Sequence, residues 1–304
     1  MIVVALADSD SYLKWGAATL DRVVPDEERH IIVVANPVMP SSAQRDSALA
    51  TTSWAGHDVE VLTADAAVER VRTLGADAVL VAMRGPTAAL LLAMLAELPR
   101  RPVLWSGIPG IALPARRKAL VYRAQADLMI VHSHHERDAF RALDDVEGMH
   151  HQFALTTLPF LDRRPGAGDD IVFAAQALVP ATRAQRRHLV ASLVATAEAN
   201  PDRRVVLKVR ARAGEKQTHD ERWPLESLLP SVVPHNLLVQ SGPMTAVLDR
   251  AGGVASVSST ALIEAVARGI PALVLGDYGV GDEQLNGIFE TSGLIGSTAD
   301  LEAA

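Results

Sequence analysis

GGVASVSSTALIEAVARGIPALVLGD, residues 252–277, contains the elements of a parallel β-sheet in their simplest order. An apolar run (252–258) predicts a strand, the next residues (259–269) have helical spacing, and a second apolar run (271–277) predicts another strand. Strands that omit polar alternation are typical of a parallel sheet that helices cover on both faces. Three hydroxyl residues, Ser258, Ser259 and Thr260, stand where the first strand gives way to the helix.

The same alternation extends through the whole chain. Helical spacing is found in the intervening segments 12–24, 65–75, 87–98, 182–200 and 259–269. Short apolar runs predict strands at 1–7, 30–36, 58–63, 77–83, 101–107, 127–133, 170–176, 203–210, 236–242, 252–258 and 271–277. Strands that alternate with amphipathic helices indicate the α/β class, here as two Rossmann-like, doubly wound domains.

One segment, LPFLDRRPGAGDD (158–170), interrupts the alternation with two prolines, two glycines and several charges. This composition is typical of a linker between domains. We therefore predict an N-terminal domain at 1–160, a linker at 161–170 and a C-terminal domain at 171–304, with the two domains facing a cleft. Ligands of such sheets bind beyond the carboxyl ends of the strands, so the loops that follow the strands are the candidate sites.

Composition narrows the function classes. The 304 residues are 49% hydrophobic with a mean hydropathy of +0.15, as expected of a globular protein with a sizeable core. A net charge of −7 and a pI near 5.8 argue against nucleic acid as the main partner. The absence of cysteine excludes disulfides and thiolate metal sites, which fits a cytoplasmic protein. The first residues have no basic region before a short apolar run, so we expect neither a signal peptide nor a transmembrane segment; peripheral membrane contact and the oligomeric state stay open.

The first candidate site follows the first predicted strand, in ADSDSYLKWG (7–16). Asp8, Ser9, Asp10 and Ser11 crowd the start of a helix, with Lys14 one turn further on. A single Ser or Asp suffices to cap a helix, and four such residues exceed that need. A carboxylate here could serve as a general base, with Asp10 the first choice and Asp8 the second.

Further candidates in the N-terminal half are Arg84 in MRGPT (83–87), and Gly107 and Gly110 in WSGIPG (105–110). Glycines after strands allow a ligand to approach the backbone, and arginine suits an anionic group. For each residue taken alone, however, tight turns and a solvated basic helix face are the favoured explanation. The basic residues further along are Arg116, Arg117, Lys118 and Arg123. The histidines at 132, 134 and 135 lack the spacing of a helical metal pair, and we predict no metal site and a helix cap at Ser133.

Candidates in the C-terminal half also follow strands. Lys208 and Arg210 alternate near a strand end and predict a phosphate contact, with Glu215 in the loop beyond. Gln176 could bind a base or sugar edge or merely close a turn, and Thr182 predicts a helix cap. The hydroxyls of Ser258, Ser259 and Thr260 lie at a helix N-terminus, which binds anions, and the cap and a phosphate seat do not exclude each other. Glu264, one turn into this helix, could bond a ribose hydroxyl.

The stretch SVSSTALIEAVARGIPALVLGD, together with LKVR and FAAQ, resembles the nucleotide-sugar-binding half of GT-B glycosyltransferases. The likeness is to the capsule-polysaccharide, polysialyltransferase-like members, and covers most of 170–298. It implies that Ser258, Ser259 and Thr260 bind the donor phosphate and that Glu264 binds the nucleotide ribose. Two motifs of those enzymes are missing: the His-Pro motif, whose place falls near Lys208 and Arg210, and the acidic-acidic-Gly base motif, which leaves Asp8 and Asp10 by position only.

The resemblance implies a metal-independent glycosyltransferase without a cofactor. Its donor would be a nucleotide-sugar of the CMP or UDP type, and its acceptor a hydroxyl of a glycan or glycolipid, as in cell-surface polysaccharide synthesis. The alternatives are a nucleotide-sugar epimerase or hydrolase of the same fold, and a two-lobed binding protein without catalytic activity.

Overall fold

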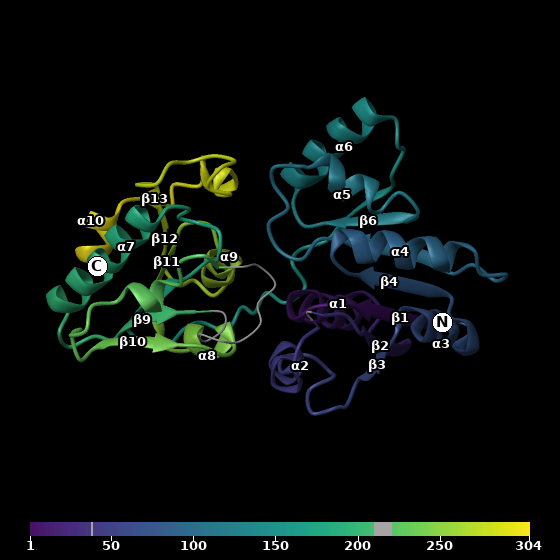
Figure 1. Cartoon of the computed structure of the whole chain (residues 1–304), viewed down its shortest axis with the longest axis horizontal. Coiled ribbons are helices and arrows are strands. Elements are labelled where there is room, and N and C mark those ends of the chain that lie inside the picture. Colours follow the sequence, from purple (N-terminus) through teal and green to yellow (C-terminus); the bar gives the residue numbers. More distant parts are fainter. Residues whose placement is uncertain (38, 210–220) are drawn as a thin grey trace. The chain divides into compact units, whose positions relative to one another are not determined.

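The computed structural model describes residues 1–37, 39–209 and 221–304 (Figure 1). The chain forms two compact units, Met1–Phe160 and Leu161–Ala304. Each unit contains one sheet in which every strand pairs in parallel with its neighbours. The two-sheet α/β architecture predicted from the sequence is confirmed.

The first unit alternates strands and helices along its length. Its strands are β1 (Ile2–Ala7), β2 (Glu28–Val34), β3 (Glu60–Leu62), β4 (Ala78–Ala82), β5 (Val103–Gly107), β6 (Leu128–Val131) and β7 (Phe153–Leu155). Its helices are α1 (Asp10–Val23), α2 (Ser42–Leu49), α3 (Ala64–Leu74), α4 (Gly85–Ala96), α5 (Arg117–Val121) and α6 (His134–Glu147). The strand order β3-β2-β1-β4-β5-β6-β7 reverses direction between β1 and β4.

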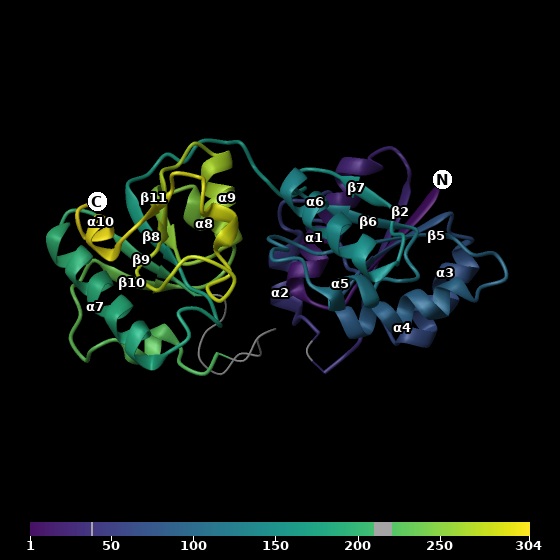
Figure 2. The same cartoon turned by 90° about the horizontal axis from the view of Figure 1, so that it is seen from above.

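Both faces of the first sheet are covered, which explains why its strands are apolar throughout. Residues of α1 such as Leu13 and Leu20 pack with Ala5 and Val33 on one face. On the other face, residues of α3 and α4 pack with alternate residues of β1 and β2, and Figure 2 shows these two helices side by side. The loops after β1 and β4 therefore meet at the reversal point between two helix layers.

The second unit repeats this plan. Its strands are β8 (Asp170–Ala174), β9 (Val205–Lys208), β10 (Leu237–Gln240), β11 (Ala251–Ser256), β12 (Ala272–Leu275) and β13 (Ile295–Gly296). Its helices are α7 (Arg183–Ala199), α8 (Met244–Leu248), α9 (Thr260–Ala267) and α10 (Thr298–Glu302), with short 3-10 turns η1 (Leu225–Leu228) and η2 (Gly287–Phe289). The order β10-β9-β8-β11-β12-β13 reverses between β8 and β11.

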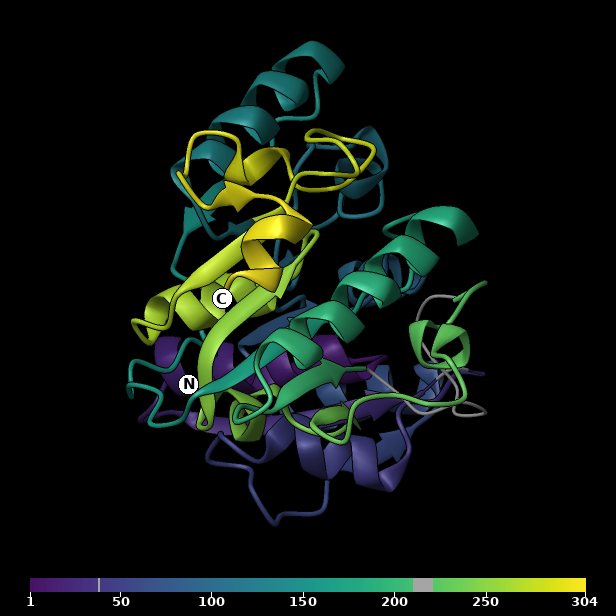
Figure 3. The ribbon, with the colours of Figure 1, turned by 90° about the vertical axis from the view of Figure 1, so that its left-hand side faces the viewer.

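The core of the second unit lies under α7. Leu189 and Leu193 of this helix pack with Phe173 of β8 and Leu207 of β9. The C-terminal helix α10 lies against α7, as Figure 3 shows. The predicted cap at Thr182 is confirmed, because its hydroxyl accepts a hydrogen bond from the backbone N–H of Gln185.

Residues 161–170, predicted as a linker, are packed on the second unit. The buried guanidinium of Arg268 donates to Asp162, and the N–H of Asp170 donates to the carbonyl of Arg250. A Cβ on Gly168 would lie 2.0 Å from the carbonyl oxygen of Arg250, so only glycine allows this close passage. The glycines of this segment thus let it lie against the start of β11.

Other differences from the predicted elements are small. The first helix begins at Asp10 rather than residue 12, and α2, α5, α8, α10, β7 and β13 were not predicted. Most of these are five residues or shorter, too short for a periodic pattern to show. Among the described residues no helix has both the length and the apolar character to cross a membrane.

Candidate functional site

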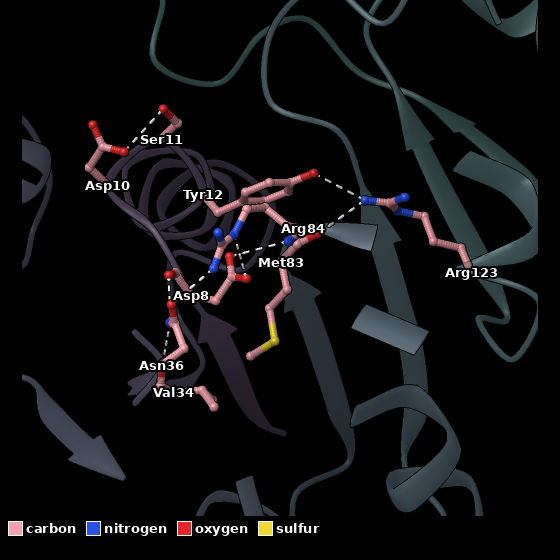
Figure 4. Close-up of polar contacts among 9 residues, drawn as sticks. All are labelled: Asp8, Asp10, Ser11, Tyr12, Val34, Asn36, Met83, Arg84 and Arg123. Atoms are coloured by element: carbon pink, nitrogen blue, oxygen red, sulfur yellow. Dashed lines mark hydrogen bonds and ion pairs between the residues drawn. The ribbon is translucent and has the colours of Figure 1, made fainter. Parts of the chain in front are cut away.

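Asp8 and Arg84 form an ion pair where the first sheet reverses (Figure 4). Asp8 follows β1 and is fully buried, whereas the side chain of Arg84, at the start of α4, is 29% exposed. The backbone N–H of Arg84 donates to one carboxylate oxygen at 3.2 Å, and its Nε donates to the other at 3.0 Å. Both residues were candidates from the sequence, but their pairing was not predicted.

Asn36, which follows β2, completes this arrangement. Its side-chain oxygen accepts from Nη2 of Arg84 at 2.9 Å, and its amide nitrogen donates to the carbonyl of Asp8, also at 2.9 Å. Sequence reasoning missed Asn36. It could have been found by the rule that selected Asp8, because it is the first strongly polar residue after a buried strand.

Asp10 and Asp8 differ in their surroundings. Asp10 is the first residue of α1 and is partly exposed, and its carboxylate accepts a hydrogen bond from the hydroxyl of Ser11 at 3.4 Å. Asp8 has both oxygens engaged by Arg84 and no exposed surface. A general base must reach the proton that it removes, so this arrangement argues against Asp8, the second choice from the sequence, and favours Asp10.

Ser9 is the N-cap residue of α1, yet its hydroxyl does not cap the helix. Within the described part of the chain, the buried Oγ of Ser9 has no hydrogen-bond partner. Lys14, one turn into α1, places its ammonium 4.4 Å from the centre of the Phe160 ring.

Arg123 is almost fully buried between the ends of β4, β5 and α1. Its Nε donates to Ser106 Oγ and to the carbonyl of Gly107, and its Nη2 donates to the carbonyl of Met83 and to the hydroxyl of Tyr12 at 3.1 Å (Figure 4). Burial raises the pKa of Tyr12, and the charge of Arg123 opposes this shift. The sequence offered two roles for Arg123, a positive charge near a ligand and a residue on a solvated basic helix face. The structure buries it, which excludes the solvated face.

The two glycine candidates of this region have structural reasons of their own. A Cβ on Gly107 would lie 2.8 Å from the indole ring of Trp15, so the packing of α1 on β5 requires glycine. Gly110 has φ of +90°, in the region that favours glycine. Neither position needs a ligand to explain it, and the role of Gly107 and Gly110 in a ligand site stays a prediction.

The histidine segment behaves as a structural element. Trp15 Nε1 donates to His132 Nε2 at 2.8 Å, and Nδ1 of His132 lies 3.1 Å from the carbonyl oxygen of Thr156, which assigns a neutral ring protonated at Nδ1. Burial lowers the pKa of His132. Ser133 caps α6 through the N–H of Glu136, as predicted. Across residues 1–37, 39–209 and 221–304, no three His, Cys, Asp or Glu side chains form a group that could hold a metal ion.

In the second unit, Gln176 links the loops after β8 and β11. Its side-chain oxygen accepts from the N–H of Ser258 at 2.6 Å and from the hydroxyl of Ser256 at 3.3 Å, and its amide nitrogen donates to the carbonyl of Ser258. These loops flank the point where the second sheet reverses. Of the two roles considered from the sequence, the structure shows the one in which Gln176 fixes a turn.

Ser258 also holds the loop after β12, because its hydroxyl donates to the carbonyl of Leu285. Asn286 is fully buried and braces this loop by accepting from the N–H of Gly281 and donating to the carbonyl of Gly279. The neighbouring Gln284 has a buried side-chain oxygen with no partner in the part of the chain that the structure describes. Sequence reasoning missed this loop; its run of glycines, acids and amides directly after a strand was the available signal.

The three hydroxyl residues at the start of α9 differ in their positions and contacts. Ser259 is the N-cap, and its hydroxyl accepts from the N–H of Ala261 at 3.2 Å; Thr260 is the first residue of the helix. The hydroxyl of Ser258 donates to the carbonyl of Leu285, in the loop after β12. The three hydroxyls therefore have three different positions, and only Ser259 and Thr260 stand at the helix N-terminus itself.

The remaining donor-site candidates lie deeper or outside the described residues. Lys208, at the end of β9, is 5% exposed and its ammonium donates to the carbonyl of Val209 at 2.6 Å. Its phosphate contact, expected from the sequence, stays a prediction. Glu264 of α9 is also buried. Arg210 and Glu215 lie outside the residues that the structure describes.

A family model described as "Putative glycosyltransferase (DUF6716)" matches residues 3–304. The chain belongs to this family. The prediction of a glycosyltransferase is thus confirmed at the level of the family. No curated protein matches the chain in sequence.

Solved structures with the same fold support the GT-B assignment. S. aureus MnaA in a complex with UDP has a TM-score of 0.63 and 11% identity, over 99% of this chain and 86% of that chain. Phytolacca americana UGT2, bound to UDP-2fluoro-glucose and pterostilbene, has a TM-score of 0.61 and 10% identity, over 100% and 89%. Methanocaldococcus jannaschii UDP-GlcNAc 2-epimerase, bound to UDP-GlcNAc and UDP, has a TM-score of 0.58 and 10% identity, over 100% and 91%.

Proposed function

We propose that this DUF6716 protein transfers a sugar from a nucleotide-sugar bound by its second unit to an acceptor hydroxyl bound by its first unit. The observation that carries the donor assignment is the junction at Ser258. This residue joins the loops after β8, β11 and β12 through Gln176 and Leu285, directly before the N-terminus of α9. Doubly wound sheets bind their ligands at the reversal point, which here lies between β8 and β11.

The proposed phosphate-binding site is the first turn of α9. A helix N-terminus offers unpaired N–H groups and the positive end of the helix dipole. The hydroxyls of Ser259 and Thr260 add two donors at the same place. Because Gln176 and Leu285 fix Ser258, the turn is ordered before a ligand arrives, and little free energy is then needed to organise it on binding.

We propose that such a site supports transfer without a divalent ion. Negative charge develops on the departing nucleotide as the bond to the sugar breaks, and donors that already point at that phosphate stabilise it where it forms. Within this proposal the buried Lys208 contributes positive charge from behind the strand end rather than direct contact, and Glu264 holds the ribose.

The donor nucleotide is proposed to be uridine diphosphate. The MnaA, UGT2 and 2-epimerase structures contain UDP or a UDP-sugar, and the second unit shares their fold. A cytidine nucleotide, suggested by the polysialyltransferase-like resemblance, is the alternative.

On the first unit, Asp10 is proposed as the general base that removes the proton of the acceptor hydroxyl. It stands at the carboxyl end of β1 and is partly exposed, as a base requires. Asp8 and Asn36 have the different task of orienting Arg84. A glycan or glycolipid-type acceptor remains the proposed acceptor class.

The test is a turnover assay on the full chain. UDP-sugars and CMP-sugars are supplied in parallel with a glycan acceptor mixture, with and without EDTA. The proposal expects nucleotide release that depends on acceptor and is unchanged by EDTA. Release without acceptor would indicate a hydrolase, interconversion of the sugar without release would indicate an epimerase, and loss of activity in EDTA would contradict metal independence.

A further inference from the structure

Arg123 carries a buried charge, and the described residues contain no ion pair with it. In the described part of the chain, its hydrogen bonds all go to neutral oxygens, namely those of Tyr12, Met83, Ser106, Gly107 and Ala119. A buried guanidinium is costly unless a negative charge stands nearby. The carboxylate that shares its surroundings is Asp8, since both charges act on the hydroxyl of Tyr12.

Asp8 is already paired with Arg84. The ends of β1, β4 and β5 thus bring together two guanidinium groups and one buried carboxylate (Figure 4). Among these three buried or half-buried groups the positive charges outnumber the negative one, although the whole chain has a net charge of −7.

Arg84 can present this charge to a ligand. Asp8 binds its Nε and Asn36 binds its Nη2, while Nη1 has no partner among the described residues. The side chain is 29% exposed. A guanidinium held on one edge and open on the other is suited to bind a carboxylate or phosphate group.

A second unsatisfied group lies in the preceding turn. Ser9, next to Asp8 in the chain, has a buried hydroxyl without a partner in the described residues, and it makes no cap bond to α1. Buried hydroxyls are normally hydrogen-bonded, and exceptions call for an explanation.

We propose that the acceptor substrate carries an anionic group, a carboxylate or a phosphate, which binds the guanidinium of Arg84 at the reversal point of the first sheet. The inference rests on the proposed function, because it names the acceptor class of the same reaction. The bound anion adds a second negative charge beside Arg84, which already pairs with Asp8, and so offsets the charge of the neighbouring Arg123. Asp10 remains the base for the hydroxyl, which belongs to another part of the acceptor.

The test uses the full chain with UDP present in excess, so that the second unit is occupied, and measures binding by calorimetry. One arm compares a uronic-acid oligosaccharide with the same oligosaccharide after carboxyl reduction. The other arm compares a phosphorylated sugar with its dephosphorylated form. The proposal expects at least tenfold tighter binding of the anionic member in one arm, and that arm identifies the anion.

Arg84→Gln is expected to abolish the preference for the anionic member. Because this substitution leaves the buried Asp8 without its partner, the double variant Asp8→Asn with Arg84→Gln is measured as well, and the same loss is expected. Arg100→Gln is the matched control. Arg100 also pairs with an aspartate, Asp77, but this pair lies at the amino end of β4, and the variant should keep the preference.

Equal binding of both members in both arms would overturn the proposal, as would a preference that survives in the double variant. The binding of UDP is measured in the same samples. If UDP binds while the preference is absent, the anionic acceptor is wrong and the donor site stands; if UDP does not bind, the proposed function itself fails.

Discussion

Arg84 donates two hydrogen bonds to Asp8, one from its backbone and one from its side chain, across 76 positions of the sequence. The contact joins the ends of β1 and β4, the two strands between which the first sheet reverses. The pair thereby fixes the start of α4 relative to the start of α1, where the proposed base stands.

Arg84→Met should destabilise the protein by about 3–5 kcal/mol, because it leaves the carboxylate of Asp8 buried without its counter-charge. Urea unfolding measures the loss. Adding Asp8→Asn should recover much of it, since no charge then remains unpaired. Arg100→Met, which breaks an exposed pair with Asp77, should cost at most about 1 kcal/mol. An equal loss in both single variants would contradict the buried-pair account.

Ser9→Ala should leave the free energy of unfolding unchanged or raise it slightly. The hydroxyl of Ser9 makes no cap bond, so its removal takes away an unpaired buried group. Ser133→Ala is the contrast, because Ser133 does cap α6, and its loss should cost about 1 kcal/mol. If Ser9→Ala were as destabilising as Ser133→Ala, the hydroxyl of Ser9 would have a hydrogen-bond partner, and the prediction would be wrong.

Asp10→Asn should lower kcat by about 10²–10⁴ while UDP affinity stays the same, since a general base acts in the chemical step. Asp65→Asn is the matched control, because Asp65 also lies in the first turn of a helix, α3, and interacts with its dipole in the same way. If Asp10→Asn kept the turnover of the wild type, another residue would have to be the general base.

The free energy of unfolding should fall as the pH is lowered, and His132 is one cause. Burial lowers its pKa in the folded state, so below pH 6.5 the unfolded chain takes up a proton that the folded protein resists. The stabilisation is therefore present above about pH 6.5 and is lost as the pH falls toward and through the folded-state pKa. Urea unfolding from pH 7.5 to 5 should show a shallower decline in His132→Gln than in the wild type. His57→Gln, at an exposed histidine, should follow the wild type.

The sequence predicted the elements of this fold well where one local pattern determines them. Strands such as β4 and β8 are buried along their whole length, and the caps Thr182 and Ser133 act on residues three positions away. The strand-end rule also selected Asp8, Arg84, Gln176 and Ser258, which lie at the reversal points of the two sheets.

What could not be predicted depends on contacts between distant residues. Gln176 and Ser258 are 82 positions apart, and Arg123 reaches Tyr12 across 111. A glycine in a sequence does not reveal whether it makes room for a ligand or for Trp15, as Gly107 does. Likewise, alternation along the strand did not predict that Lys208 would be buried.

The most direct test of the donor site is a calorimetric titration of UDP into the wild type and Ser259→Gly. Glycine is tolerated at an N-cap at a cost of a few tenths of a kcal/mol, so the variant loses the hydroxyl but keeps the helix start. Ser297→Gly, at the N-cap of α10 in the same unit, controls for that effect. The account predicts that UDP binds the wild type and Ser297→Gly equally and binds Ser259→Gly at least tenfold more weakly. Equal affinity in all three, or no binding to the wild type, would contradict it.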